Sequence, residues 1–234
     1  MEAIGSVDWA SIAGRPDWYD PECAAAGMRE LAAATSNLAA AVAATRLRGH
    51  GILHDHSGAV FPAAAVAAPL LLDIVERGHP AAKNAAVVLL NDALDFEPFS
   101  GYTRIDVPSA RAVPLCCAIA ECVRARRDLL TGYGKEGRSL LERTAEHWCF
   151  AIRELVIDDT DTIAFGFLDG TFPDGHHPAE LHDAHRIIPL LEVTLEYPLD
   201  DGSAEACLRL VGVPPDHVRT NTLLYSAECG ARVH

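Results

Sequence analysis

The first half of the chain places apolar residues at helical spacing between short polar breaks. Asp20-Pro21-Glu22 combines an acidic N-cap with proline at the first helical position and an acid in the first turn. One stripe then recurs every three or four positions up to Arg48, through Met28, Leu31, Thr35, Leu38 and Val42. This pattern predicts a helix from Pro21, or two helices if Thr35-Ser36-Asn37 forms a turn and a new N-cap.

Two further segments predict antiparallel helix pairs. In residues 62–96, a broad apolar face ends at Gly78, and His79-Pro80 begins a second helix, so the very short turn forces antiparallel neighbours. After a loop that contains proline and glycine, a stripe runs from Cys116 to Leu130. Past Gly132 and Gly134, a returning stripe is predicted at Leu141, Ala145, Trp148, Ile152 and Leu155.

The last third is rich in turn formers. They fill residues 158–161 and 169–175, which predicts a long loop or a cap. Short helices are predicted from Pro178 to Leu191, from Ser203 to Val211, and from Pro214 to Gly230.

Helix pairs of roughly 35 to 50 residues predict an all-α fold, a short HEAT- or armadillo-like α-solenoid of stacked antiparallel helix pairs with an irregular, loop-rich C-terminal third. We expect a helical-pair repeat region over residues 1–157. Residues 158–234 would form a loop and a C-terminal helical cap, continuous with the repeat region.

One stretch of sequence carries a resemblance to a known family. Val7-Asp8-Trp9 and the run His54-Asp55-His56-Ser57-Gly58-Ala59-Val60-Phe61-Pro62-Ala63-Ala64 resemble the HEAT-repeat-like proteins common in actinobacteria, most of which have no assigned activity. The match covers about the first 95 residues. Its most specific element is the His-x-Gly run that leads into Phe-Pro-Ala-Ala. The resemblance implies an α-solenoid and says little about activity.

Composition and charge favour a folded protein with a protein partner. Half of the residues are apolar, 22% are charged, and the formal net charge is -14. The negative charge repels nucleic acids and anionic membranes. The short arginine groups lack the interleaved aromatic residues that a nucleic-acid-binding surface would have. We therefore expect no nucleic acid and no membrane as partners, but a protein with a basic surface. The oligomeric state stays open.

The N-terminal residues, the lack of a long apolar stretch and the cysteine spacing all point to a reducing compartment. Glu2 stands where a secretory signal would carry a basic residue, and the longest uncharged apolar stretch, 59–72, is interrupted by two prolines and is too short to span a bilayer. The seven cysteines show no C-x-x-C spacing, and the adjacent Cys116-Cys117 would point about 100° apart on a helix. We predict a cytoplasmic protein whose helical cysteines are buried, reduced thiols.

Two histidine clusters are candidate metal sites. On a helix from Pro178, His182 and His185 would share one face, and His177 or Asp174 could add a ligand from the loop. The second cluster comprises His50, His54 and His56, with Asp55 able to orient one ring. Solvated helix-start residues in the first case, and a glycine-flanked turn in the second, are the favoured alternatives.

No familiar catalytic signature is present. The sequence has no G-x-S-x-G, Walker A, dinucleotide-binding or H-E-x-x-H motif, and the acids at 158, 159 and 161 lack EF-hand spacing and favour a helix-capping turn. The leading hypothesis is a non-catalytic protein-binding scaffold with an acidic surface, of an immunity or regulatory type, with no cofactor. The alternative is a metal-dependent enzyme or metal-binding protein that uses a divalent metal such as zinc. A DNA-repair enzyme is disfavoured by the charge.

Overall fold

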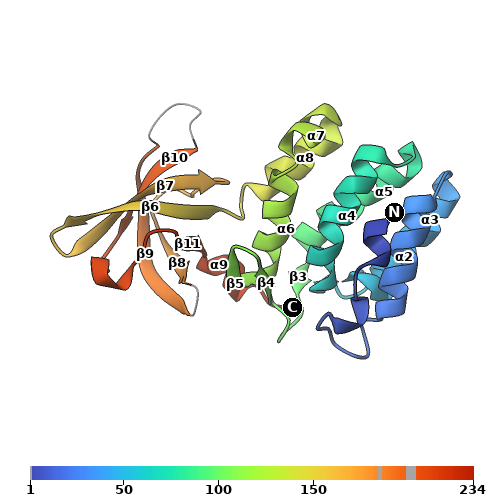
Figure 1. Ribbon diagram of the computed structural model, residues 1–234, viewed down its shortest axis with the longest axis horizontal. Coiled ribbons are helices and arrows are strands. Elements are labelled where there is room, and N and C mark those ends of the chain that lie inside the picture. Colours follow the sequence, from blue (N-terminus) through green and yellow to red (C-terminus); the bar gives the residue numbers. More distant parts are fainter. Residues whose placement is uncertain (1, 184–185, 199–203) are drawn as a thin grey trace. The chain divides into compact units, whose positions relative to one another are not determined.

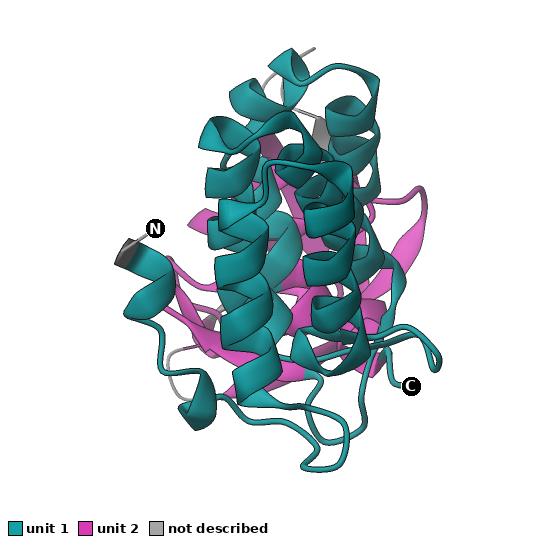
Figure 2. Ribbon diagram, turned by 90° about the vertical axis from the view of Figure 1, so that its right-hand side faces the viewer, with its two compact units in different colours: residues 1–103, 118–144, 232–234 teal, residues 104–117, 145–231 magenta. Residues whose placement is uncertain are grey.

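The computed structural model describes residues 2–183, 186–198 and 204–234. The chain divides into two compact units, coloured separately in Figure 2. The helical unit comprises Met1–Thr103, Ala118–Thr144 and Arg232–His234, and the barrel unit comprises Arg104–Cys117 and Ala145–Ala231. Each unit is described by itself below.

The helical unit is built mainly from helices that follow one another along the chain (Figure 1). Its N-terminal helices are α1 (Glu2–Gly5), the 3-10 turn η1 (Trp9–Ser11), α2 (Pro21–Ala33), α3 (Asn37–Arg46) and the π-helical turn η2 (Leu47–Gly51). The hairpin of α4 (Ala63–Arg77) and α5 (Pro80–Asp95) follows. Short strands β1 (Leu53–His54), β2 (Ala59–Val60) and β3 (Glu97–Pro98) form a small sheet. The remaining helices are α6 (Leu115–Arg124), which begins in the barrel unit, α7 (Arg127–Gly132) and α8 (Lys135–Thr144).

Several predicted helix boundaries are confirmed. The Asp20 carboxylate accepts hydrogen bonds from the backbone N–H groups of Glu22 and Cys23, at 2.8 and 3.4 Å, and caps α2. The Ser36 hydroxyl accepts from the Ala39 N–H and starts α3, so the first stripe belongs to two helices. The predicted hairpin at 62–96 corresponds to α4 and α5.

The first stripe is only partly buried. Met28 and Leu31 are fully buried, but Leu38 and Val42 on α3 are 77% and 55% exposed. The turn at Ser36 explains the change, because it starts a new helix whose inner face carries alanines, including Ala40 and Ala43. No helix in the described part of the chain combines the length and the apolar character needed to cross a bilayer.

The barrel unit contains a closed, antiparallel six-stranded barrel. Its strands are β6 (Cys149–Asp158), β7 (Asp161–Asp169), β8 (His176–His182), β9 (Ile187–Pro198), β10 (Glu205–Leu210) and β11 (Leu223–Ser226), in the order β10-β7-β6-β11-β8-β9. A separate hairpin of β4 (Arg104–Val107) and β5 (Ala110–Pro114) leads into α6. The 3-10 turn η3 (Pro215–His217) precedes β11, and α9 (Ala227–Ala231) follows it directly.

Alternation along the strands fills the barrel. On β7, Thr162, Ala164 and Gly166 are buried while their neighbours are partly exposed, as a strand with one inward face requires. Gly166 permits a close approach, because a Cβ atom there would lie 2.0 Å from the Ala151 carbonyl oxygen. The core side chains of the barrel are Trp148, Phe150, Ile152, Ala164, Phe172, Ala179, Leu181, Leu190, Val193, Ala206, Leu208, Leu210, Val218 and Leu224.

The predicted all-α solenoid is therefore wrong, and so is the fold implied by the HEAT-repeat resemblance. The helix expected from Pro178 to Leu191 is the antiparallel pair of β8 and β9, and the one expected up to Val211 is β10, with Ser203 outside the described residues. The segment from Pro214 to Gly230 holds a 3-10 turn, a strand and one short helix. Bulges in β6, β8 and between β9 and β10 interrupt the alternation that marks a strand.

The returning stripe and the acidic segment after it differ in part from the prediction. Helix α8 ends at Thr144, so Ile152 and Leu155 lie on strand β6. Trp148 is nonetheless buried at 2% exposure in the barrel core, which confirms the predicted core position. The acids at 158–161 form the turn between β6 and β7, where Asp159 adopts a positive φ, and they cap no helix.

Candidate metal centre

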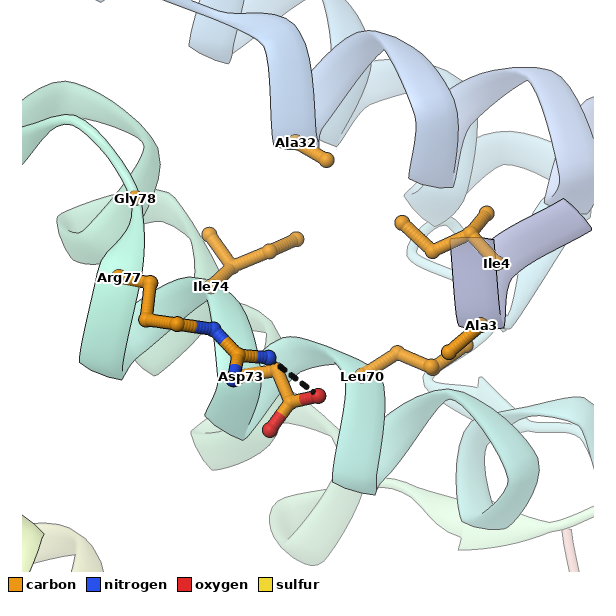
Figure 3. A pocket seen from close by; sticks show the side chains of 8 residues that line it. All are labelled: Ala3, Ile4, Ala32, Leu70, Asp73, Ile74, Arg77 and Gly78. Atoms are coloured by element: carbon orange, nitrogen blue, oxygen red, sulfur yellow. Dashed lines mark ion pairs between the residues drawn. The ribbon is translucent and has the colours of Figure 1, made fainter. Parts of the chain in front are cut away.

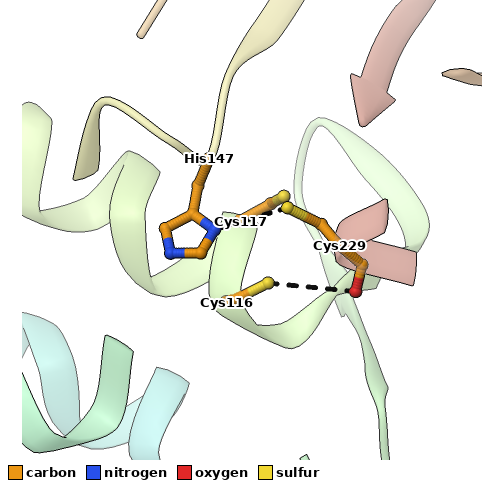
Figure 4. Close-up of side chains that lie close together, drawn as sticks. All are labelled: Cys116, Cys117, His147 and Cys229. Carbon is orange, nitrogen blue, oxygen red and sulfur yellow. Dashed lines mark hydrogen bonds between the residues drawn. The ribbon is translucent and has the colours of Figure 1, made fainter. Parts of the chain in front are cut away.

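Four side chains converge inside the barrel unit. The thiols of Cys116, Cys117 and Cys229 and a ring nitrogen of His147 all lie within 4.8 Å of one another, and all four residues are buried. Figure 4 shows them turned toward one another from three separate pieces of the chain. Among the described residues, this is the one group of three or more possible metal ligands with donor atoms in such proximity.

Three structural junctions carry these side chains. Strand β5 runs directly into α6, whose first turn holds Cys116 and Cys117. His147 lies just before β6, and Cys229 lies in α9, which continues directly from β11. The first turn of a helix favours anionic thiolates, because its backbone N–H groups carry partial positive charge. All four ligands thus come from places where a barrel-unit strand begins or ends.

Hydrogen bonds connect the four groups. The Cys116 thiol donates to the carbonyl oxygen of Cys229 at 4.0 Å, and Nδ1 of His147 lies 3.3 Å from the sulfur of Cys229. Hydrogen bonding from Cys117 and then from Cys229 lowers the pKa of the Cys116 thiol well below its usual range, despite burial. The pKa of Cys117 is raised, because it donates to Cys116 and Cys229 and is buried. The two vicinal thiols therefore differ in acidity, with Cys116 the more acidic.

The donor set matches a soft divalent metal. Three cysteines and one histidine are a regular shell for structural zinc, with sulfur at about 2.3 Å and nitrogen at about 2.0 Å in a tetrahedron. Such a tetrahedron places the donor atoms about 3.5 to 4 Å apart. The observed limit of 4.8 Å requires a contraction of about 1 Å, which side-chain rotation can supply. A nucleophilic role fits less well, because a substrate must reach its nucleophile and these residues are at most 5% exposed.

Of the predicted cluster of Asp174, His177, His182 and His185, His177 and His182 lie on strand β8 instead of a helix, and Asp174 lies in the bend before it. His177 Nε2 is 2.9 Å from the Asp174 carbonyl oxygen, so these two residues interact through the backbone. The His182 side chain is fully buried and contacts Glu180 and the carbonyl of Arg111. His185 lies outside the described residues. The prediction that His182 shares a helix face with a second ligand assumed a helix, whereas His182 lies on strand β8. A metal site there stays a prediction.

The predicted loop cluster partly assembles in the helical unit. The ring centroid of His54 lies 5.7 Å from that of His50 and 6.1 Å from that of His56, and His54 stacks on Trp18 at 4.5 Å. His50 Nδ1 is 3.1 Å from the Trp18 carbonyl oxygen, and His54 Nδ1 is 2.9 Å from the Ser57 hydroxyl. Asp55 is exposed in the turn that follows β1. His50 thus contacts a backbone carbonyl and His54 a hydroxyl of the same turn, and metal binding there stays a prediction.

The helical unit contains several hollows, two of which lie beside α4 and α5. One hollow of about 100 Å³ is lined by Ile4, Leu70 and Ile74 and, along one side, by the ion pair between Asp73 and Arg77 (Figure 3). This volume is a fraction of the roughly 300 Å³ that drug-sized ligands need. A groove of about 460 Å³ runs between α5 and the α7–α8 pair, but its lining mixes apolar, amide, hydroxyl and charged side chains without a shared chemistry. Neither hollow has donor chemistry as specific as the cysteine and histidine cluster.

Sequence reasoning identified Cys116 and Cys117 as buried thiols, which is confirmed, but it did not place them in a site. It missed His147 and Cys229. Cys116 and Cys229 are 113 residues apart in the chain, so no local spacing connects them. The available signal was composition: vicinal cysteines at a helix start, with further cysteine and histidine at other element ends.

The comparisons with known proteins add no family. No protein-family model matches the chain, and no curated protein matches its sequence. The HEAT-repeat resemblance thus has no support from a family match, and the barrel contradicts the fold that it implied. The case for function therefore depends on the geometry of the site.

Proposed function

We propose that this protein binds one divalent metal ion of the zinc class through Cys116, Cys117, His147 and Cys229. The main evidence for this proposal is that three thiols and one imidazole, all buried, converge with their donor atoms within 4.8 Å of one another. Apolar packing alone does not account for four metal-binding groups, one of them a histidine, meeting at one point.

The proposed role of the ion is structural. Four protein ligands fill a tetrahedral shell and leave no open position for water or substrate, which distinguishes structural from catalytic zinc. The ion would fasten the start of α6, the segment before β6 and helix α9 to one another. Because metal binding to the folded state adds directly to stability, a free metal concentration a thousandfold above the Kd would contribute about 4 kcal/mol.

The test is the metal content of the untagged protein purified without chelators. We expect about one zinc per chain by elemental analysis, and a large loss of bound zinc in Cys117→Ser and in Cys229→Ser. Cys207→Ser is the matched control, because Cys207 is a buried free cysteine of the same unit outside the cluster. Wild-type protein that neither contains zinc nor takes up added zinc would refute the proposal. Equal zinc in all three variants would refute this ligand set.

We propose a second function, the binding of a protein partner, on the evidence of α3. Leu38 and Val42 stand four residues apart on this helix and are largely exposed, and residues 37–45 include no charged side chain. The net charge of -14 favours a partner with a basic surface around the apolar contact.

A photo-crosslinking residue at position 42 tests this second function. We expect a crosslink to one basic protein in the native cells, which is lost when Leu38 is replaced by Ser. A crosslinker in place of Val233, which is also exposed and apolar, is the control. No crosslink from position 42, or the same products from both positions, would count against a specific partner at α3.

A further inference from the structure

A partly buried charge network connects the segments that carry the proposed cysteine ligands. Arg104 on β4 forms two parallel hydrogen bonds with the Glu180 carboxylate on β8, at 2.8 and 2.7 Å. Nε2 of His182 lies 3.2 Å from the same carboxylate, and Nδ1 lies 3.1 Å from the Arg111 carbonyl oxygen. The Glu180 side chain is 13% exposed and that of His182 is fully buried. A fork-shaped pair of this kind fixes direction as well as distance.

The network touches both segments that carry the cysteines. Toward α6, Nη1 of Arg104 donates to the carbonyl oxygen of Ala112 at 3.0 Å. Ala112 lies on β5, four residues before Cys116, and the Arg111 carbonyl that faces His182 is on the same strand. The arginine and the histidine thus both hold the strand that leads into the two vicinal cysteines.

The other end of the network meets α9. Nη2 of Arg104 lies 3.4 Å from the carbonyl oxygen of Gly230, the residue after Cys229. A Cβ atom on Gly230 would lie 2.4 Å from both Nη2 of Arg104 and Oε1 of Glu180, so only glycine fits against the ion pair. The register of β11 on β8, which pairs Tyr225 with Glu180, brings the start of α9 to this place.

Helix α9 depends on such outside contacts. It has five residues, and a helix this short is not stable by itself. The position of the Cys229 thiol therefore follows from what α9 packs against.

Glu180 is ionised at neutral pH. Burial raises its pKa, but hydrogen bonds from His182 and Arg104 outweigh burial and lower the pKa to about 2.

We propose that Arg104, Glu180 and His182 are positioning residues of the metal centre, which set the spacing between Cys229 on α9 and the Cys116–Cys117 pair behind β5. This inference rests on the proposed metal binding. Its consequence is that the network controls metal affinity without contributing a ligand, as outer-shell groups do in other metal sites.

The experiment uses the full chain loaded with Co²⁺, whose visible absorption reports the number and geometry of thiolate ligands, followed by competition with Zn²⁺ for affinity. We expect Arg104→Gln to weaken zinc binding about 10- to 100-fold and to change the cobalt spectrum. Arg104→Lys, which restores the charge without the fork, should recover part of the affinity. Glu180→Gln is a second variant with unchanged side-chain size, to be used if Arg104→Gln does not fold.

Arg209→Gln is the matched control. Arg209 is also partly buried and pairs with Asp158, Asp161 and Glu196, but it lies on β10 between β7 and β9. We expect wild-type cobalt spectrum and zinc affinity from this control.

The outcomes separate the two proposals. Wild-type protein that binds neither metal overturns the proposed function, and with it this inference. Wild-type protein that binds metal, with Arg104→Gln and Glu180→Gln equal to it in spectrum and affinity, overturns the positioning role alone.

Discussion

Replacing Glu180 by Gln removes the one negative charge between Arg104 and His182. The pKa of Glu180 is lowered from 4.5 to about 2 in the folded chain, the net result of burial, which raises it, and of the hydrogen bonds from His182 and Arg104, which lower it. At about 1.36 kcal/mol per pKa unit, this shift corresponds to about 3 kcal/mol of stability. The side chain is only 13% exposed, so solvent screening is limited.

The sign follows from the lowered pKa. The ionised form is preferred in the folded state, so the contribution is fully present above the unfolded pKa of 4.5 and is lost as the pH falls toward about 2. We expect Glu180→Gln to be less stable than wild type by about 3 kcal/mol near neutral pH. The difference should shrink steadily below pH 4.5.

The assay is urea unfolding at a series of pH values, followed by the fluorescence of Trp148 after Trp9 and Trp18 are replaced by Phe. A chelator keeps the protein metal-free, so that loss of metal in acid does not contribute. Glu228→Gln, at an exposed carboxylate of the barrel unit, controls for the loss of one charge. A difference between Glu180→Gln and wild type that is the same at neutral and at acidic pH would refute the reasoning.

Three further predictions concern packing and ionisation. Trp148→Ala should cost about 3 to 5 kcal/mol, because the ring is 2% exposed and lies 4.8 Å from Phe172, and an unchanged thermal melt would exclude it from the core. Gly166→Ala should destabilise the barrel by about 1 to 3 kcal/mol in the same melts, whereas Gly132→Ala, where a Cβ meets open space, should not; equal melts would contradict the close strand contact. Tyr19→Phe should reduce the phenol absorbance change near pH 12 in an ultraviolet titration, since burial and then the Asp20 carboxylate raise the pKa of Tyr19 to about 12; an unchanged titration in the variant would disprove the assignment.

The helical hairpin of α4 and α5 was predictable because its structure is encoded locally. The apolar face after Pro62, the break at Gly78 and the proline at position 80 lie within one continuous stretch, and each has a direct effect on the backbone. Likewise, the N-cap role of Asp20 follows from the residues immediately after it.

The barrel was missed because its local signals are weak. In β10, Ala206, Leu208 and Leu210 are buried at every second position, but Cys207 between them is buried as well, which blurs the alternation. The Asp-Gly dipeptide at 201–202 is a sequence signal for a hairpin turn. In β6, however, the bulge between Ile152 and Glu154 shifts the alternation, and Leu155 then falls at a helical spacing from Ile152. Short apolar runs of this kind fit a helix or a strand equally well.

The candidate site was harder to predict than the barrel, because pairing between strands that are far apart in the sequence brings its residues together. Cys229 reaches His147 across 82 residues only after β11 pairs with β6 and β8. The predicted histidine clusters were chosen for proximity in sequence. On β8, His176 and His177 follow one another and thus point to opposite faces, so proximity in sequence does not gather ligands there.

X-ray absorption at the zinc edge of the purified, zinc-loaded protein tests the central claim most directly. Ligation by Cys116, Cys117, His147 and Cys229 predicts a four-coordinate ion with three sulfur atoms at about 2.3 Å and one imidazole nitrogen at about 2.0 Å. A shell of nitrogen and oxygen atoms without sulfur would show that the metal binds elsewhere and would contradict the account.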